Sequence, residues 1–236
     1  MNMMTTVGQR LRKRHWDNPQ LRLWYEALFH FLPVQTAEGP LITNYLETAH
    51  HVLSRARASH CKIMALPLTL RYPASMPLSD LTAHNTVMNR FLSFLRWELD
   101  HLSTSHPVDM RYLWCREQVT SHKPHYHVIL LFNGNALSSL GTLKASTAIG
   151  EEAYSKDCMY HRLVRAWEWA ISWPAHQMQG LVDMSEDNIT DQLFVYHFHR
   201  DDQNAFKQLF YAASYLCKAY SKPIGQGMHC FEGSRL

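Results

Sequence analysis

Two histidines and one glutamate are spaced so that together they could hold a divalent metal ion. His125 and His127 lie in the apolar run HYHVILLFN, which is typical of a β-strand, and alternate residues of a strand point to the same face. The preceding run, RYLWCREQ, contains Glu117, and the short polar segment between the two runs predicts an antiparallel hairpin that brings Glu117 opposite the histidines. Two imidazoles and one carboxylate suit Mg²⁺ or Mn²⁺ and leave coordination positions open for a phosphate oxygen.

A His-x-His pair on a strand can also arise by chance, without binding metal, in a chain with 16 histidines. A second pair, His197 and His199, illustrates this, because it has no carboxylate on an evident partner strand and is followed by the charged stretch Arg200-Asp201-Asp202. We therefore interpret the second pair as the end of a strand and not as a metal site.

A second group of reactive side chains lies in the run FKQLFYAASYLCKAYSK, where the apolar spacing predicts a helix over residues 203–220. Tyr211, Tyr215, Lys218 and Lys222 follow one another at steps of three or four, so this helix would place them on one face. A phenol ionises near a pH of about 10, so attack on a phosphodiester needs a general base, a nearby cation or a metal ion. The plainer interpretation is an amphipathic helix with tyrosines at its edge and lysines in water.

The elements that must position these side chains alternate between strands and helices. After the helical pattern of the first 60 residues, the sequence predicts a strand over 62–73, a helix beginning at Asp80, the hairpin, a helix over 157–172, strands over 179–184 and 192–199, and the final helix. This order predicts an α+β fold in which helices pack on an antiparallel sheet.

The first 60 residues predict an N-terminal helical extension. Residues 21–29 and 41–57 both have apolar side chains at helical spacing, and a break over 33–40 separates them. The predicted organisation is therefore a helical accessory segment over 1–60, a domain over 61–224 and a C-terminal tail over 225–236.

Composition narrows the class of protein. The five cysteines form no C-x-x-C motif, which argues against a disulfide framework or a thiolate zinc site. No apolar run approaches the about 18 residues of a membrane helix, and the first residues lack the apolar stretch of a secretory signal. We expect a cytoplasmic protein with no membrane contact.

The charge is uneven along the chain. Residues 1–71 hold nine Lys/Arg against four Asp/Glu, although the whole chain carries a formal net charge of only +3. The basic start suits contacts with DNA phosphates through counterion release, and a solvated flexible arm is the alternative. The candidate phosphate contacts are Arg10, Arg12, Lys13 and Arg14, together with Lys222 near the C-terminus.

The combination of Glu117, the triplet His125-Tyr126-His127 and the Tyr215-to-Lys218 spacing resembles the HUH (His-hydrophobic-His) endonucleases, specifically the replication initiators of rolling-circle phages and plasmids. Within them it is most similar to the inovirus gene-two-type replication proteins, which include the YagK/YfjJ proteins of cryptic prophages. The likeness covers roughly residues 60–224, including the early strand LPLTLRY, and leaves out the predicted helical start.

This resemblance implies a ferredoxin-like central antiparallel sheet flanked by helices, with the HUH endonuclease domain over 61–224. It also implies that Mg²⁺ or Mn²⁺ assists a tyrosine in nicking single-stranded origin DNA, with or without a hairpin. A 5′-phosphotyrosyl link and a free 3′-OH would form, the ends would later be rejoined, and a host helicase and DNA polymerase would act on the nicked strand.

The resemblance also distinguishes the two tyrosines. Tyr215 is the expected nucleophile because Lys218 stands three residues after it, as in the family's Y-x-x-K pattern. Tyr211 is a candidate second nucleophile, but Ser214 occupies the position where relatives with two active tyrosines commonly have a lysine. Two alternatives remain open: a relaxase or transposase that acts on single-stranded DNA by the same chemistry, and a prophage DNA-binding protein without cleavage activity.

Overall fold

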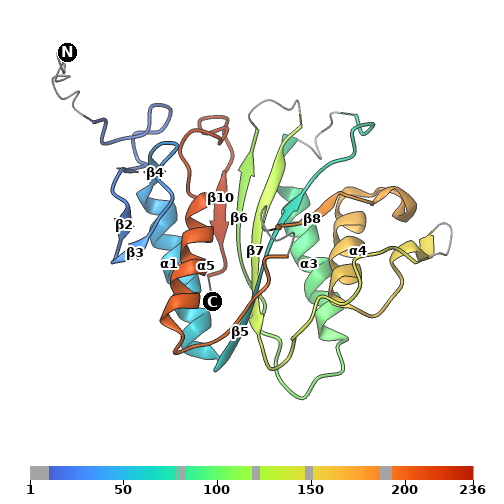
Figure 1. Cartoon of the computed structure of the whole chain (residues 1–236). Helices are drawn as coiled ribbons and strands as arrows, with labels where there is room; N and C mark the ends of the chain where they lie inside the picture. Colours follow the sequence, from blue (N-terminus) through green and yellow to red (C-terminus); the bar gives the residue numbers. More distant parts are fainter. Residues whose placement is uncertain are drawn as a thin grey trace, which may run out of the picture.

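A six-stranded antiparallel sheet forms the centre of the molecule (Figure 1). The computed structural model describes residues 11–77, 79, 83–118, 123–146, 151–186 and 193–235. The strand order is β10-β6-β7-β5-β8, and β9 pairs with β5 beside β8. The strands are β5 (Lys62–Leu70), β6 (Arg111–Glu117), β7 (His125–Asn133), β8 (Val182–Met184), β9 (Tyr196–His199) and β10 (Phe231–Gly233).

Helices cover both faces of this sheet, which confirms the predicted α+β class (Figure 1). The helices are α1 (Thr43–Ser59), α3 (Thr86–Asp100), α4 (Met159–Ile171) and α5 (Gln203–Tyr215), with 3₁₀ turns at Glu151–Tyr154 and Ala175–Gln177. Among the described residues, no helix is long and apolar enough to cross a membrane.

The alternation of side chains along β7 divides the core into two layers. Its even-numbered residues, such as Val128 and Leu130, pack with α3 and α4, whereas Ile129 and Leu131 pack with α1 and α5. His125 and His127 share the parity of Ile129 and therefore point toward the layer of α1 and α5. The fold thus directs the histidine pair toward the helix that carries the tyrosines.

The predicted N-terminal helical extension is not seen, and the helix predicted over residues 21–29 is wrong. This region forms short strands instead: β1 (Leu23–Trp24) pairs with β4 (Leu41–Ile42), and β2 (Leu28–Phe29) pairs with β3 (Leu32–Pro33). The apolar residues that suggested a helix contact a distant element, since Phe29 stacks on Phe210 of α5 with ring centroids 6.4 Å apart. Helix α1 confirms the other predicted helix, over 41–57, to within two residues at each end.

The last helix begins as predicted but ends early. The Asp202 side chain caps it by accepting hydrogen bonds from the backbone N–H groups of Asn204 and Ala205. The helix then ends at Tyr215, because the following residues pair with β4: Ile42 N–H donates to the Cys217 carbonyl at 2.8 Å, and Lys218 forms a β-bridge with Leu41. The residues after Tyr215 therefore do not extend the predicted helical row.

The division of the chain into segments 1–60, 61–224 and 225–236 stays a prediction. Two sets of contacts link these segments in the folded chain. Helix α1 packs in the same apolar core as β5, β6 and β7, and β10, which belongs to the last segment, pairs with β6 in register Phe231↔Cys115.

Candidate metal and tyrosine site

The hairpin of β6 and β7 brings the three predicted ligands together. Glu117 lies directly opposite His125, and Cys115 lies opposite His127, so Glu117 and both histidines are on one face at one end of the hairpin. The apolar residues that follow on β7 are buried on both faces, and pairing with β6 on one side and β5 on the other holds this register.

The ligand atoms of these three residues converge within 4.8 Å of one another. Nε2 of His127 is 3.5 Å from Oε2 of Glu117, and Nε2 of His125 is 3.9 Å from the same oxygen. Within the described ranges, this is the one group of at least three His, Cys, Asp or Glu side chains with such geometry. Two neutral imidazoles and a carboxylate are a suitable donor set for a divalent ion, so these residues could hold one.

The two oxygens of the Glu117 carboxylate have different surroundings. Oε1 accepts a hydrogen bond from Ser221 Oγ at 2.8 Å and another from Lys222 Nζ at 3.3 Å, and the ammonium of Lys218 lies 3.6 Å away. Oε2 faces the histidines instead. The lysines and the serine therefore anchor one oxygen and leave the other directed toward the candidate metal position.

These contacts keep a buried carboxylate ionised. The Glu117 side chain is 4% exposed, and burial alone would raise its pKa. The hydrogen bond from His127 and the positive charges of Lys222 and Lys218 outweigh burial and hold the pKa of Glu117 well below its usual range. The ligand is thus negatively charged at neutral pH.

The histidines are prepared for metal binding in two ways. Burial, and then the charge of His127, lower the pKa of His125 to about 4, so its imidazole is neutral at pH 7. Nδ1 of His127 shares a hydrogen bond of 3.1 Å with Thr69 Oγ1, which orients the ring so that Nε2 faces Glu117. Both residues therefore present a nitrogen to the centre of the group.

Tyr215 lies beside this group at the end of α5. Its ring meets the His127 ring edge-on, with centroids 5.3 Å apart. The Lys218 ammonium lies 3.3 Å from the Tyr215 ring centroid while also approaching Glu117, so it links the tyrosine to the carboxylate. The site therefore places a phenol, a cation and the candidate metal ligands next to one another.

The structure keeps Tyr211 on the helix face of Tyr215, as predicted, but places Lys222 outside the predicted row. Tyr211 is 46% exposed and lies one helical turn from Tyr215. Lys222 was expected on the surface, but its side chain is fully buried against Glu117. Its contact with DNA stays a prediction; in this conformation its ammonium is engaged by the carboxylate.

The sequence matches a family model across most of the chain. Residues 26–234 match the YagK/YfjJ C-terminal domain. The chain belongs to this family. The matched region includes the three candidate ligands, Tyr215 and Lys218, and it also includes α1, which lies within the predicted accessory segment 1–60.

A relative in Escherichia coli (strain K12) supports this membership. The chain is similar to the "Uncharacterized protein YfjJ", with 24% identity over 213 residues, which is 84% of this chain and 96% of the relative. No solved structure matches the chain. Sequence similarity therefore establishes membership in the YagK/YfjJ family, and the structure shows how the candidate site residues of this member are arranged.

The second histidine pair of this family member does not form a metal group in the described part of the chain. Strand β9 ends at His199, as interpreted from the sequence. Nε2 of His197 lies 3.2 Å from the Gly134 carbonyl, and His199 is exposed with Nδ1 3.3 Å from Asp201.

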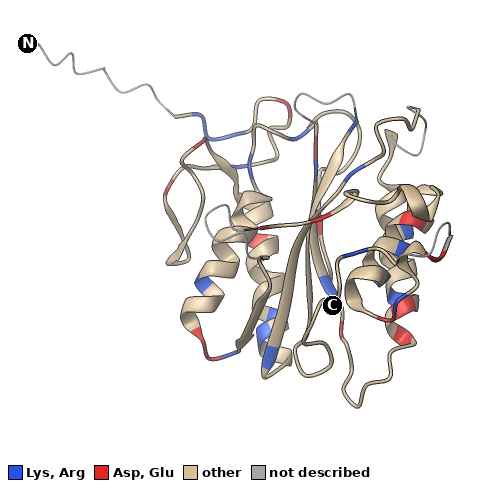
Figure 2. Cartoon of the chain, turned by 45° about the vertical axis from the view of Figure 1, so that its right-hand side comes forward, with Lys and Arg blue, Asp and Glu red and all other residues tan. Residues whose placement is uncertain are grey.

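The basic residues predicted to contact phosphates lie at the N-terminal end of the described chain (Figure 2). Arg10 lies outside the described residues, whereas Arg12, Lys13 and Arg14 are exposed. The backbone holds this segment against β1, since Leu23 N–H donates to the Lys13 carbonyl at 3.0 Å. The predicted phosphate contacts of these residues stay predictions.

Sequence reasoning did not identify Thr69 or Ser221, or the role of Lys222 as a partner of Glu117. Thr69 contacts His127 through the pairing of β5 with β7, a register between strands 58 residues apart that no local pattern reveals. Ser221 stands next to Lys222 in a polar run after the tyrosine helix, and nothing in its spacing marks it as a partner of a buried carboxylate.

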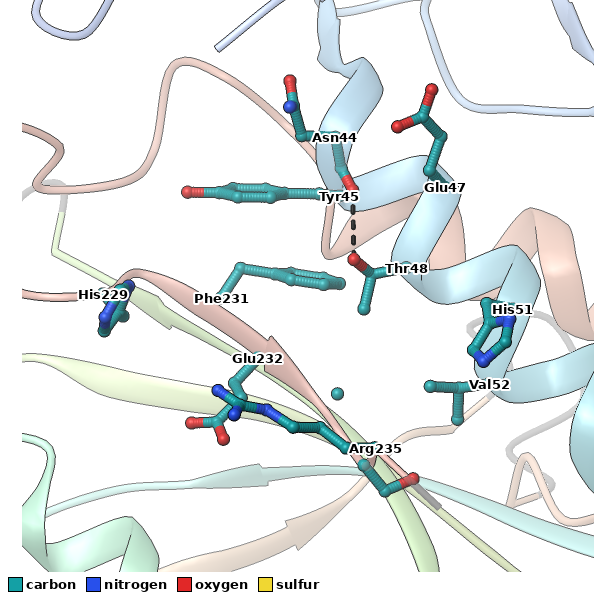
Figure 3. A pocket seen from close by; sticks show the side chains of 12 residues that line it. Asn44, Tyr45, Glu47, Thr48, His51, Val52, His229, Phe231, Glu232 and Arg235 are labelled. Carbon is teal, nitrogen blue, oxygen red and sulfur yellow. Dashed lines mark hydrogen bonds between the residues drawn. The ribbon is translucent and has the colours of Figure 1, made fainter. Parts of the chain in front are cut away.

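A pocket lies between α1 and β10 at the edge of the sheet, away from the candidate metal ligands (Figure 3). It has a volume of about 720 Å³, and the rings of Tyr45 and Phe231 stack in it with centroids 4.5 Å apart. His51 and His229 also line it. The candidate ligands and Tyr215 lie outside this pocket.

Proposed function

We propose that this YagK/YfjJ family member is a metal-dependent HUH endonuclease that nicks single-stranded DNA by attack of Tyr215, as initiators of rolling-circle replication do. The observation that carries the proposal is the convergence of Glu117, His125 and His127 beside Tyr215 and Lys218. These residues come from β6, β7 and the end of α5, and they supply a metal-binding group, a phenol and a cation within one site.

The topology supports the HUH part of the proposal. The elements β5, α3, β6, β7, α4 and β8 follow the β-α-β-β-α-β order, and their strands lie in the sequence β8-β5-β7-β6 with every neighbour antiparallel. Helices α3 and α4 pack on the same face of the sheet. This order and pairing support our proposal of a ferredoxin-like unit, in which β7 would be a central strand carrying both histidines.

The proposed chemistry is a transesterification. A bound Mg²⁺ or Mn²⁺ would make the scissile phosphate more electrophilic by polarising one of its oxygens. The Tyr215 oxygen bonds to phosphorus as the bond from phosphorus to O3′ breaks, and the phenol proton is transferred in net terms to O3′. The products are a 5′-phosphotyrosyl ester and a free 3′-OH, and the reverse reaction rejoins the ends.

Each residue has a defined task in this scheme. Lys218 lies over the Tyr215 ring and would supply positive charge beside the phosphate during attack. Thr69 orients His127, and Ser221 and Lys222 orient Glu117. The free 3′-OH would serve a host DNA polymerase as a primer, with a host helicase separating the strands.

The test is a cleavage assay on a pool of hairpin-bearing single strands labelled at the 5′ end, with Mn²⁺ or Mg²⁺ present. We expect the wild type to nick a subset of strands and His125→Ala to lose cleavage while it still binds DNA. His197→Ala is the matched control, because it removes a histidine of the second pair. Unchanged cleavage by folded His125→Ala would overturn the proposal.

A further inference from the structure

A groove leads away from Tyr215 and His127 along α5. It has a volume of about 940 Å³ and lies between α5, the adjoining part of β5 and β7, and the chain segment that leads into β9. Tyr215 and His127 line it, so the groove and the candidate site are continuous. A ligand whose reacting group lies at Tyr215 would therefore extend into it.

Aromatic side chains are concentrated in this groove. Phe194, Tyr196, Tyr211 and Tyr215 all line it, and Phe194 and Tyr211 are 38% and 46% exposed. The rings of Phe194 and Tyr196 are nearly parallel, with an angle of 8° between their planes and 6.3 Å between their centroids. Tyr196 is partly buried against the core, and Phe194 stands exposed beside it in the groove, so the pair offers a rigidly held flat surface next to the reactive site.

The polar groups of the groove suit a strand with an anionic backbone. Lys207 and Gln208 line it from exposed positions on α5. Gln35, on another side, is fixed by a hydrogen bond of 2.8 Å from its side-chain Nε2 to the Tyr211 carbonyl. Glu186 also lines the groove and would repel phosphates locally, so the favourable backbone contact is on the α5 side, at Lys207.

We propose that Phe194 and Tyr196 form a stacking platform for unpaired bases next to the cleaved phosphate, and that Lys207 contacts the backbone of the same strand. This inference rests on the proposed function, since it assigns the groove to the substrate of that site. Stacking on aromatic rings accepts any base, because every base has a flat face. Paired bases are covered by their neighbours, so the platform selects single strands over duplex.

The experiment is a binding titration without cleavage. A fluorescein-labelled oligodeoxythymidine is titrated with protein in EDTA, and fluorescence anisotropy gives the dissociation constant. We expect Phe194→Leu and Tyr196→Leu, which keep apolar volume but remove the flat ring, to weaken binding about 5- to 150-fold each, the equivalent of about 1–3 kcal/mol per lost base stack. Trp97→Leu is the control, because Trp97 is 54% exposed on α3, on the opposite face of the sheet.

Three further measurements separate stacking from general loss of affinity. On an abasic strand of the same length, the Phe194 and Tyr196 variants should bind as the wild type does, because no base is present to stack. Lys207→Met should reduce the salt dependence of binding by the equivalent of one phosphate contact, a slope change of about 0.7 in log K against log salt. A duplex competitor should displace the labelled strand poorly.

The outcomes distinguish this inference from the proposed function. If the folded leucine variants bind oligodeoxythymidine as tightly as the wild type, or if the wild type does not bind it, the platform is wrong even if the protein nicks DNA. If these variants lose binding as expected but the wild type does not nick any strand with Mn²⁺, the platform stands and the nickase proposal fails.

Discussion

Lys222 tests how the buried carboxylate of Glu117 is stabilised. Its ammonium is 3.3 Å from Glu117 Oε1, and its side chain is fully buried. Replacing it in Lys222→Met removes the charge but keeps most of the apolar volume. Glu117 then retains Ser221, the weak donor Cys115 Sγ at 3.8 Å and the more distant ammonium of Lys218 as partners of that oxygen.

The size of the effect follows from the distance. Two unit charges at this separation attract by about 5 kcal/mol at an effective dielectric constant of about 20. Removing one partner of a buried pair costs about 3–5 kcal/mol, because the remaining charge is left undercompensated. For a chain of this size each kcal/mol corresponds to roughly 2–4 °C, so we expect the metal-free variant to melt roughly 6–20 °C below the wild type.

The assay is thermal unfolding with EDTA and with Mn²⁺. Mn²⁺ supplies positive charge next to Glu117, so we expect it to raise the melting temperature of Lys222→Met more than that of the wild type. Lys207→Met is the matched control, since Lys207 is exposed and its removal should change stability by about 0.5 kcal/mol or less. A metal-free Lys222→Met protein that melts with the wild type would refute the assigned role of Lys222.

Three other predictions concern the site and its surroundings. Ser221→Ala should weaken Mn²⁺ binding about 10-fold in calorimetry, because Glu117 loses an orienting hydrogen bond; unchanged affinity would contradict this. His197→Ala should leave Mn²⁺ affinity unchanged, and a clear loss would indicate that the second histidine pair binds metal. Burial would raise the pKa of Asp109, but contacts with His60 and Arg111 lower it. Asp109→Asn should therefore destabilise the protein above a pH of about 4, and urea unfolding should show this deficit fading as the pH falls through the lowered pKa; a deficit independent of pH would argue against the ion pair.

The hairpin could be predicted from sequence because its information is local. Two apolar runs of strand length joined by a short polar connection predict both strands and their antiparallel pairing. With the register known, Glu117 must lie opposite His125, and this is what the structure shows. The three residues of the metal-binding group lie within 10 positions of one another in the chain.

The elements that depend on distant contacts were harder to predict. No glycine or proline marks the end of α5 after Tyr215, and the next proline is Pro223. The helix ends there because residues 216–218 turn to meet β4. A continued helix would have carried Lys222 along the row of Tyr215 instead of into the site beside Glu117.

The N-terminal region illustrates the same limit. Apolar residues at helical spacing between 21 and 29 satisfy a helix pattern, yet their partners lie on α5 and β4. The spacing of apolar residues along the sequence shows which side chains are suited to burial, but it does not show which part of the fold buries them. The positive φ angles of His30 (49°) and Phe31 (62°), which form the turn between β2 and β3, have no clear sequence signal either, because neither residue is glycine or asparagine.

The most direct test of the central claim is identification of the covalent intermediate. The protein is incubated with Mn²⁺ and a cleavable single strand, the nucleic acid is trimmed with nuclease, and tryptic peptides are analysed by mass spectrometry. We predict a nucleotide joined through its 5′-phosphate to Tyr215, a released fragment whose 3′-OH a polymerase can extend, and no adduct in Tyr215→Phe. An adduct on Tyr211 in the wild type, or cleavage by folded Tyr215→Phe at the wild-type rate, would contradict the account.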